Sequence, residues 1–186
     1  MYEAYEYTAK HGIVLERDYA PFKARKGTCD TEQIKKKWHF KNVGQEEKDG
    51  MTNEEMKRRI MVQPLGVAIY APGILMSYSS GVITEAYLHC SRDSFEVNHG
   101  VVVVGFGTVD SNEKVHGLCS EYWIVRNSWG KDWGEEGTFK LCMDGSFSDN
   151  QPLGICHINE FGTWPTMYET TDEDDDDDEN SSITPI

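Results

Sequence analysis

The segment NHGVVVVGFG, residues 98–107, and the segment YWIVRNSWGKDWGEEG, residues 122–137, carry the strongest structural pattern in the chain. Each contains a run of β-branched and aromatic residues bounded by Gly or Asn, which is typical of a short buried strand. A polar side chain flanks each run: His99 precedes the first and Asn127 follows the second. We therefore predict two strands that each present one polar side chain at an end.

Similar runs elsewhere predict a sheet. The expected strands cover residues 65–70, 101–106, 122–126 and 138–143, with a last strand-like piece near 155–161. No long helices alternate with these runs, so we expect a mainly antiparallel, barrel-like sheet. The predicted fold class is α+β, with short helices at the periphery of the sheet.

Two helices are predicted from end signals. Residues 52–55, TNEE, match a capping box ahead of an apolar pattern that Pro64 ends, which indicates a short amphipathic helix. Residues 3–11 predict a helix that stops at Gly12 and that we expect to begin before residue 1. Residues 16–50 are expected to be extended loop, with short strand pieces around 38–43.

The charge of the chain is concentrated at one end. The run Asp172 to Glu179 contains eight of the 32 acidic residues, which leaves 24 acidic against 18 basic residues elsewhere. Such a body offers no basic face, so we expect no nucleic-acid partner. The sequence contains no run of about 18 apolar residues, which is the length that would predict a membrane span. Residues 1–12 lack the pattern of a signal peptide, so none is expected in this chain.

Two tempting motifs do not predict a cofactor. Gly105-Phe-Gly107 follows an apolar run as in a dinucleotide fingerprint, but Asp110 stands at the third glycine position and no helix pattern follows. Neighbouring His and Cys residues show no spacing that indicates convergence on zinc. These neighbours are His89-Cys90, His116 with Cys119, and Cys156-His157. We expect no metal or organic cofactor.

The five cysteines favour disulfides. Their spacing is too wide for a C-x-x-C zinc or redox motif, so disulfides plus one odd thiol is the better interpretation. The cysteines are Cys29, Cys90, Cys119, Cys142 and Cys156.

The segments quoted first closely resemble the histidine and asparagine segments of papain-like cysteine peptidases. In that family a histidine heads a strand, and N-S-W-G-x-x-W-G-x-x-G follows, which residues 127–137 match in full. Residues 3–29 resemble the family's central-helix segment, and shorter matches at 63–67, 81–83 and 154–156 extend the resemblance to residue 166. Gly100 stands where alanine is usual. The Q-x-x-x-C-x-x-C-W segment, which supplies the oxyanion-hole glutamine and the nucleophile, is absent.

The resemblance implies roles for three residues. His99 would stabilise the cysteine thiolate as an imidazolium and later protonate the leaving amine. Asn127 would accept a hydrogen bond from the far side of the ring and fix its tautomer, and Trp129 would cover that bond. The alternative is a hydrogen-bonded core histidine among packed tryptophans. The ordered set favours the site.

The same resemblance implies a substrate-binding pocket. It would be formed by Ala68, Val97, Asn98 and Phe161. The ring of Phe161 at the floor would make the pocket for the second residue before the scissile bond shallow, so small aliphatic residues are expected there.

The resemblance also pairs cysteines. Cys90 and Cys156 look like the family's second-domain disulfide, and Cys29 looks like one whose partner lies in the missing half. Cys119 and Cys142 have no usual counterpart, but they lie at similar heights on strands joined by one loop, so we expect a cross-strand disulfide. Two disulfides indicate an oxidising location, a lysosome-like vacuole or secretion.

The implied organisation has three parts. Residues 1–15 would be a fragment of the first domain's central helix, 16–166 the papain-like second domain with the His/Asn site, and 167–186 a disordered acidic tail. The implied function is half of a thiol endopeptidase that acts on polypeptides, with the missing N-terminal half supplied in cis or in trans and the chain alone inactive. The alternatives are an inactive papain-like binding module, or a tail that acts as a weak sink for Ca²⁺ or basic proteins.

Overall fold

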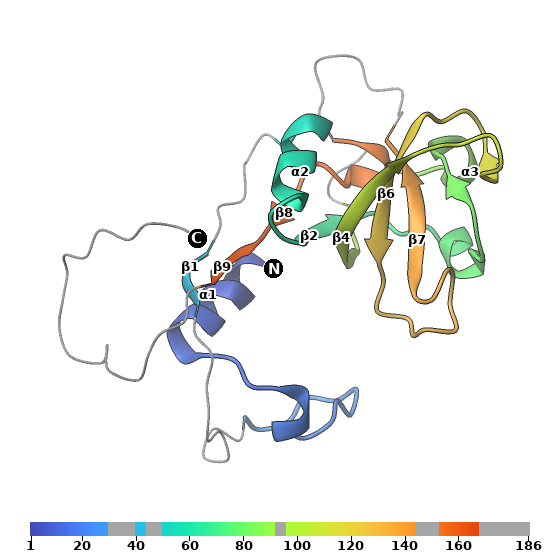
Figure 1. Ribbon diagram of the computed structural model, residues 1–186. Helices are drawn as coiled ribbons and strands as arrows, with labels where there is room; N and C mark the ends of the chain where they lie inside the picture. The colour runs from blue at the N-terminus through green and yellow to red at the C-terminus, as the bar shows by residue number, and fades with distance from the viewer. Residues whose placement is uncertain (30–39, 44–49, 92–95, 144–152, 168–186) are drawn as a thin grey trace. The chain divides into compact units, whose positions relative to one another are not determined.

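A computed structural model describes residues 1–29, 40–43, 50–91, 96–143 and 153–167 (Figure 1). The chain forms two compact units, one of residues 1–2 and 44–164 and the other of residues 3–43 and 165–186. The predicted acidic tail from residue 168 and the predicted strand residue Trp38 lie outside the described residues. The predicted domain limits at residues 15 and 166 stay predictions. None of the described helices is long and apolar enough to cross a membrane.

The larger unit is built on a seven-stranded sheet with the order β5-β3-β7-β6-β4-β2-β8. The strands are β2 (Leu65–Ile69), β3 (Val82–Ile83), β4 (His99–Thr108), β5 (Val115–His116), β6 (Glu121–Arg126), β7 (Thr138–Cys142) and β8 (Gly162–Thr163). β3 runs parallel to β5 and β7, and the other pairings of the described strands are antiparallel. The predicted α+β class and mainly antiparallel sheet are confirmed.

The sheet is open within the described residues, although a barrel-like closure was expected. Its edge strands β5 and β8 each pair with one neighbour. Both are two residues long, so they present few backbone groups with which to close a ladder.

Alternating burial explains why the central strands form. Val101 and Val103 of β4 are buried while Val102 and Val104 are exposed. β6 lies between β4 and β7 (Figure 1), and β6 and β7 bury Trp123, Val125, Phe139 and Leu141 in the same core. A period of two is the pattern that places one face of a strand against a core.

A β-bulge interrupts the pairing of β4 with β6. Val103 stands opposite Val125, but Gly105 stands opposite Ile124, so Val104 is the additional residue. Because side chains alternate between faces, one extra residue exchanges the faces of everything beyond it. The residues of β4 before Val104 therefore keep a different register from those after it.

The helices of the described residues are short. The predicted helix α1 (Tyr2–His11) ends at Gly12, which has a φ of 76° and donates its N–H to Thr8 O at 2.8 Å. The other helices are η1 (Glu16–Asp18), α2 (Asn53–Ile60), η2 (Gly73–Ser77), α3 (Glu85–Leu88) and η4 (Ile155–His157). In the second unit, β1 (Phe40–Val43) pairs with β9 (Pro165–Met167).

The predicted strand near residues 155–161 is wrong. The segment begins with η4 and turns before β8. Gly154, Cys156 and His157 have φ values of 65°, 55° and 68°, which place these residues in the left-handed region that a pleated strand does not use.

α2 begins with the predicted capping box. Thr52 Oγ1 accepts the Glu55 N–H at 3.2 Å, and Glu55 Oε2 accepts the Thr52 N–H at 2.8 Å. The hydrogen bond from the Thr52 backbone lowers the pKa of Glu55. Met56 is fully buried, and the Lys57 ammonium lies 2.8 Å from Glu121 at the start of β6. These contacts anchor the helix to the sheet.

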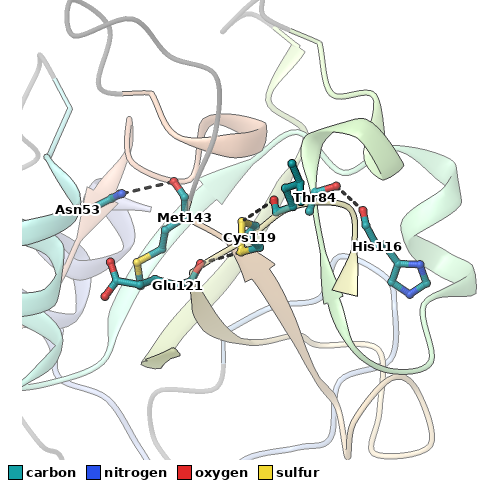
Figure 2. Close-up of a disulfide and its surroundings, with 8 residues drawn as sticks. Asn53, Thr84, His116, Cys119, Glu121 and Met143 are labelled. Atoms are coloured by element: carbon teal, nitrogen blue, oxygen red, sulfur yellow. Dashed lines mark hydrogen bonds between the residues drawn. A yellow bond between two sulfur atoms is a disulfide. The ribbon is translucent and has the colours of Figure 1, made fainter. Parts of the chain in front are cut away.

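Both predicted disulfides are present. Cys90 bonds to Cys156 with a Cα separation of 5.2 Å, and Cys119 bonds to Cys142 with a Cα separation of 5.9 Å. Figure 2 shows Cys119 between Glu121 and the hydrogen bond from Thr84 Oγ1 to His116 O. Cys29 is exposed and unpaired among the described residues.

Replacing Thr52 with alanine is expected to lower the free energy of unfolding by about 1 kcal/mol, because the side chain that satisfies the Glu55 N–H is removed. Urea unfolding of the chain measures the difference. Thr52→Ser is the control and should keep most of the stability, since serine caps equally well. Equal losses in both variants would show that the cap does not stabilise α2.

Candidate active site

The two polar residues that flank the central strands meet at one end of the sheet. His99 is the first residue of β4, and Asn127 directly follows β6. The imidazole Nε2 of His99 lies 2.9 Å from Asn127 Oδ1. Asn127 is only 7% exposed and His99 is half-buried, so their hydrogen bond is shielded from bulk water on the protein side.

The bulge at Val104 makes this contact possible. In the register next to the site, Val102 pairs with Arg126, which sets Asn127 opposite Val101. Directly opposed residues share a face of the sheet, and Val101 shares its face with His99. Continuing the register found beyond the bulge would set Asn127 opposite Val102, on the other face.

The hydrogen bonds of Asn127 determine the tautomer of His99. The Ser128 N–H donates to Asn127 Oδ1 at 2.8 Å, which identifies that atom as the amide oxygen. Because an amide oxygen only accepts, the His99 Nε2 must carry the hydrogen. In a neutral ring Nδ1 then has a lone pair, and among the described residues Nδ1 has no hydrogen-bond partner.

Asn127 also has an unused donor. Its Nδ2 is buried and lacks a hydrogen-bond partner among the described residues. A buried amide donor usually finds an acceptor, so the site is incomplete on this side of the asparagine.

Tryptophan rings cover the histidine. The rings of His99 and Trp129 are stacked, with centroids 5.1 Å apart and planes inclined by 28°. Trp133 meets Trp129 edge to face at 4.9 Å. Trp129 was expected to cover the hydrogen bond, and the structure places its ring on the imidazole itself.

The residues of the predicted pocket lie on neighbouring backbone segments. Ala68 of β2 stands opposite Gly100 and donates its N–H to Phe161 O at 3.3 Å. Asn98 donates its N–H to Ile69 O, and its Oδ1 accepts the Ala71 N–H at 2.8 Å. Val97, the residue before Asn98, is half-buried. The side chain of Asn98 is therefore engaged with backbone.

Asn127 and Trp129 can orient the imidazole of His99, which can then exchange a proton at Nδ1. Among the described residues, no hydroxyl or thiol hydrogen-bonds to His99, and no three His, Cys, Asp or Glu side chains are grouped as a metal would require. The apolar run and glycines that mimic a nucleotide fingerprint lie inside β4. They do not form the strand-to-helix turn that binds phosphate.

Sequence reasoning did not find the groups behind the tryptophans. Tyr78 contacts Trp133 at 5.5 Å, and Glu135 and Lys140 form an ion pair at 3.3 Å. Glu135 lies inside the quoted motif, so its charge beside two tryptophans was a usable signal. Tyr78 is distant in sequence and gave none.

Comparison with known proteins places these features in one family. The family model described as "Papain family cysteine protease" matches residues 1–166. Vignain of Phaseolus vulgaris is 36% identical over 167 residues, and P34 probable thiol protease of Glycine max is 28% identical over 174 residues. These matches cover 89% and 91% of the chain.

Solved structures show the same fold. The bromelain protease from Ananas comosus in complex with the E64 inhibitor has a TM-score of 0.70 and 30% identity, with 90% of this chain and 69% of that chain covered. By contrast, the chain spans only 41% of vignain and 42% of the P34 protein.

Replacing Asn127 with alanine should allow His99 to adopt both neutral tautomers. The only acceptor found for Nε2 among the described residues is lost, so the neutral ring is expected to become a mixture of Nε2–H and Nδ1–H forms. Nitrogen-15 NMR of imidazole-labelled protein distinguishes the two forms.

Ser128→Ala is the matched control for this experiment. Ser128 contacts Asn127 through its backbone N–H, so the variant should keep the Nε2–H tautomer. An unchanged tautomer in Asn127→Ala would contradict the role assigned to the amide oxygen.

Proposed function

The chain belongs to the papain family of cysteine proteases, and we propose that it supplies the histidine and asparagine of a thiol endopeptidase whose nucleophilic cysteine lies outside this chain. The observation that carries the proposal is the hydrogen bond between His99 Nε2 and Asn127 Oδ1. It places the hydrogen on Nε2 and leaves Nδ1 available for proton exchange.

The chemistry follows from this orientation. Nδ1 would take the proton of the cysteine thiol, and the resulting imidazolium would stabilise the thiolate. The thiolate attacks the carbonyl carbon of a peptide bond, and Nδ1–H protonates the leaving amine as that bond breaks. Water then attacks the thioester, its proton returns through Nδ1, and the carboxylic acid leaves with the thiolate restored. Asn127 holds the ring in one tautomer throughout.

Two observations support a nucleophile from another segment. Four of the five cysteines are bonded in two disulfides, and Cys29 is the remaining one. The chain also spans less than half the length of the two relatives compared above. The remaining length of such a protein would supply the cysteine and the glutamine that stabilises the oxyanion.

The face of β4 opposite the core supports docking of this missing half. Val102 and Val104 are exposed there, in a strand whose alternate residues are buried. Exposed β-branched residues in a row favour contact with another apolar surface. The half could be supplied in cis or in trans, and polypeptides would be the substrates.

Two disulfides support an oxidising location. Disulfides persist in secreted proteins and in oxidising compartments, so we place the protein in a lysosome-like vacuole or outside the cell.

The 186-residue chain alone is expected to show no peptide hydrolysis, because an oriented imidazole cannot form an acyl-enzyme without a nucleophile. Adding the segment encoded upstream of Met1 should restore turnover that is inhibited by E-64 and lost in His99→Ala. Fluorogenic peptide assays of the chain, of the mixture and of the variant measure this.

Cys29→Ser is the control, since Cys29 is the one unpaired thiol among the described residues. The complemented enzyme should tolerate this substitution if Cys29 is not the nucleophile. E-64-sensitive turnover by the chain alone, or an upstream segment without a cysteine, would overturn the proposal.

Phe161→Ala should enlarge the proposed pocket for the second residue before the scissile bond. The wild-type complemented enzyme is expected to prefer small aliphatic residues there. The variant should shift toward larger ones, because each methylene that fits is worth about 1–3 kcal/mol in such a pocket. Peptide-library profiling measures the preference.

Leu118→Ala, at an exposed position, is the control and should leave the preference unchanged. A wild-type preference for Arg would argue against Phe161 as the floor of the pocket.

A further inference from the structure

The ring that covers His99 depends on support from behind. Trp129 is 37% exposed and follows the last residue of β6 by three positions, so its own strand holds it weakly. Its edge-to-face neighbour Trp133 is better anchored, because the indole Nε1 donates to Met76 O at 3.0 Å and the Gly137 N–H donates to Trp133 O at 2.8 Å. The position of Trp129 over the imidazole therefore depends on Trp133.

Trp133 lies against two further rings. Tyr78 is 5.5 Å away and Phe139 is 5.8 Å away, measured between ring centroids. The Tyr78 hydroxyl donates to Gly81 O at 2.9 Å and accepts the Lys140 N–H at 3.3 Å. Burial raises the pKa of Tyr78, so the hydroxyl stays a neutral donor. An unbroken series of contacts thus runs from His99 to the segment around Gly81.

A charged network fixes the far end of this series. The Lys140 ammonium lies 2.8 Å from Glu113 Oε1 and 3.3 Å from Glu135 Oε2. The other oxygen of Glu135 accepts the Gly81 N–H at 2.9 Å. Glu135 therefore joins the loop that carries both tryptophans to the start of β3.

The network is charged and largely shielded from water. The side chains of Lys140, Glu113 and Glu135 are 20%, 17% and 30% exposed. Burial alone would lower the pKa of Lys140, but its hydrogen bonds and charge interactions with Glu113 and Glu135 hold the pKa above the usual value. A shielded pair with hydrogen bonds at both ends holds its geometry better than an exposed one.

The backbone at Gly81 is closely packed against Lys114. Gly81 has a φ of 88°, and a Cβ at this position would lie 2.6 Å from Lys114 O. The neighbouring Val82 N–H donates to that same oxygen at 2.7 Å. The Gly81 N–H that donates to Glu135 and the segment that carries Glu113 are thus held against each other.

We propose that Glu135, held by the Lys140 ammonium that Glu113 also binds, is a positioning residue for His99, acting through the rings of Trp133 and Trp129. The inference rests on the proposed function for its catalytic meaning, since a histidine that must meet a thiolate needs a fixed ring plane. The positioning itself is a property of this chain and can be measured without the missing half.

The test is the chemical shift of the His99 ring protons in the 186-residue chain. A stacked indole shifts protons on the neighbouring ring upfield, and Trp129→Ala defines the value without this ring. Glu135→Ala and Lys140→Met are each expected to move the His99 signals more than halfway toward the Trp129→Ala value. Lys140→Arg keeps the charge and the donors, so it should restore the wild-type position.

The matched control is a second lysine ion pair in the same unit. Lys57 lies 2.8 Å from Glu121 with its side chain 14% exposed, but it joins α2 to the start of β6. Lys57→Met should destabilise the chain comparably and leave the His99 signals unmoved. Should Glu135→Ala fail to fold, Glu135→Gln keeps an acceptor for Gly81 while losing the charge, and it is expected to move the signals in the same direction.

The outcomes separate this inference from the proposed function. His99 signals that stay at the wild-type position in Glu135→Ala and Lys140→Met, or that move equally in Lys57→Met, would overturn the positioning role. A failure of the upstream segment to restore hydrolysis would overturn the proposed protease function and leave the chemical-shift result intact.

Discussion

The pairing of β4 with β6 is the constraint on which the candidate site depends. This antiparallel pair brings the start of one strand beside the end of the other, so residues 28 positions apart meet within hydrogen-bond distance. The bulge at Val104 selects which faces coincide. Without that extra residue, the register that keeps Phe106 opposite the buried Trp123 would set Asn127 opposite Val102, on the face away from His99. One irregular residue thus reconciles a buried core with a functional strand end.

In the remainder of the site, the side chains become more exposed with distance from the sheet core. Trp123 and Phe139 are fully buried in the sheet core, and from there aromatic contacts lead outward through Trp133 to Trp129 and His99. The ion pairs of Lys140 lie beside the inner part of this series, where shielding strengthens them. Two polar atoms of the site lack a hydrogen-bond partner among the described residues: the buried amide nitrogen of Asn127 and Nδ1 of His99.

Local chemistry explains how much could be predicted from the sequence. The capping box at Thr52, the helix end at Gly12 and the alternating strands depend on neighbours within a few residues, and all were found. The contact between His99 and Asn127 could be predicted because the residues around them form an ordered pattern. The turn at Cys156 was missed because its positive φ values accompany a disulfide to Cys90 and contacts distant in sequence. The bulge, the open sheet edges and the Glu113–Lys140 pair likewise depend on residues that no local pattern relates.

The loop between β4 and β6, residues 109–120, joins the ends of these strands that lie farthest from His99 and Asn127. Thr108 and Glu121 are paired at its base, so the loop can lengthen or shorten without altering the register at the other end. Insertions at its exposed residues 110–112 should therefore cost the site little, whereas Glu113 and β5 must keep their contacts with Lys140 and β3. A single-residue deletion inside β4 has no such freedom, because it would reverse the orientation of every side chain on one side of the deletion. The chain is accordingly tolerant of length change at one end of a hairpin and intolerant of it within the strands.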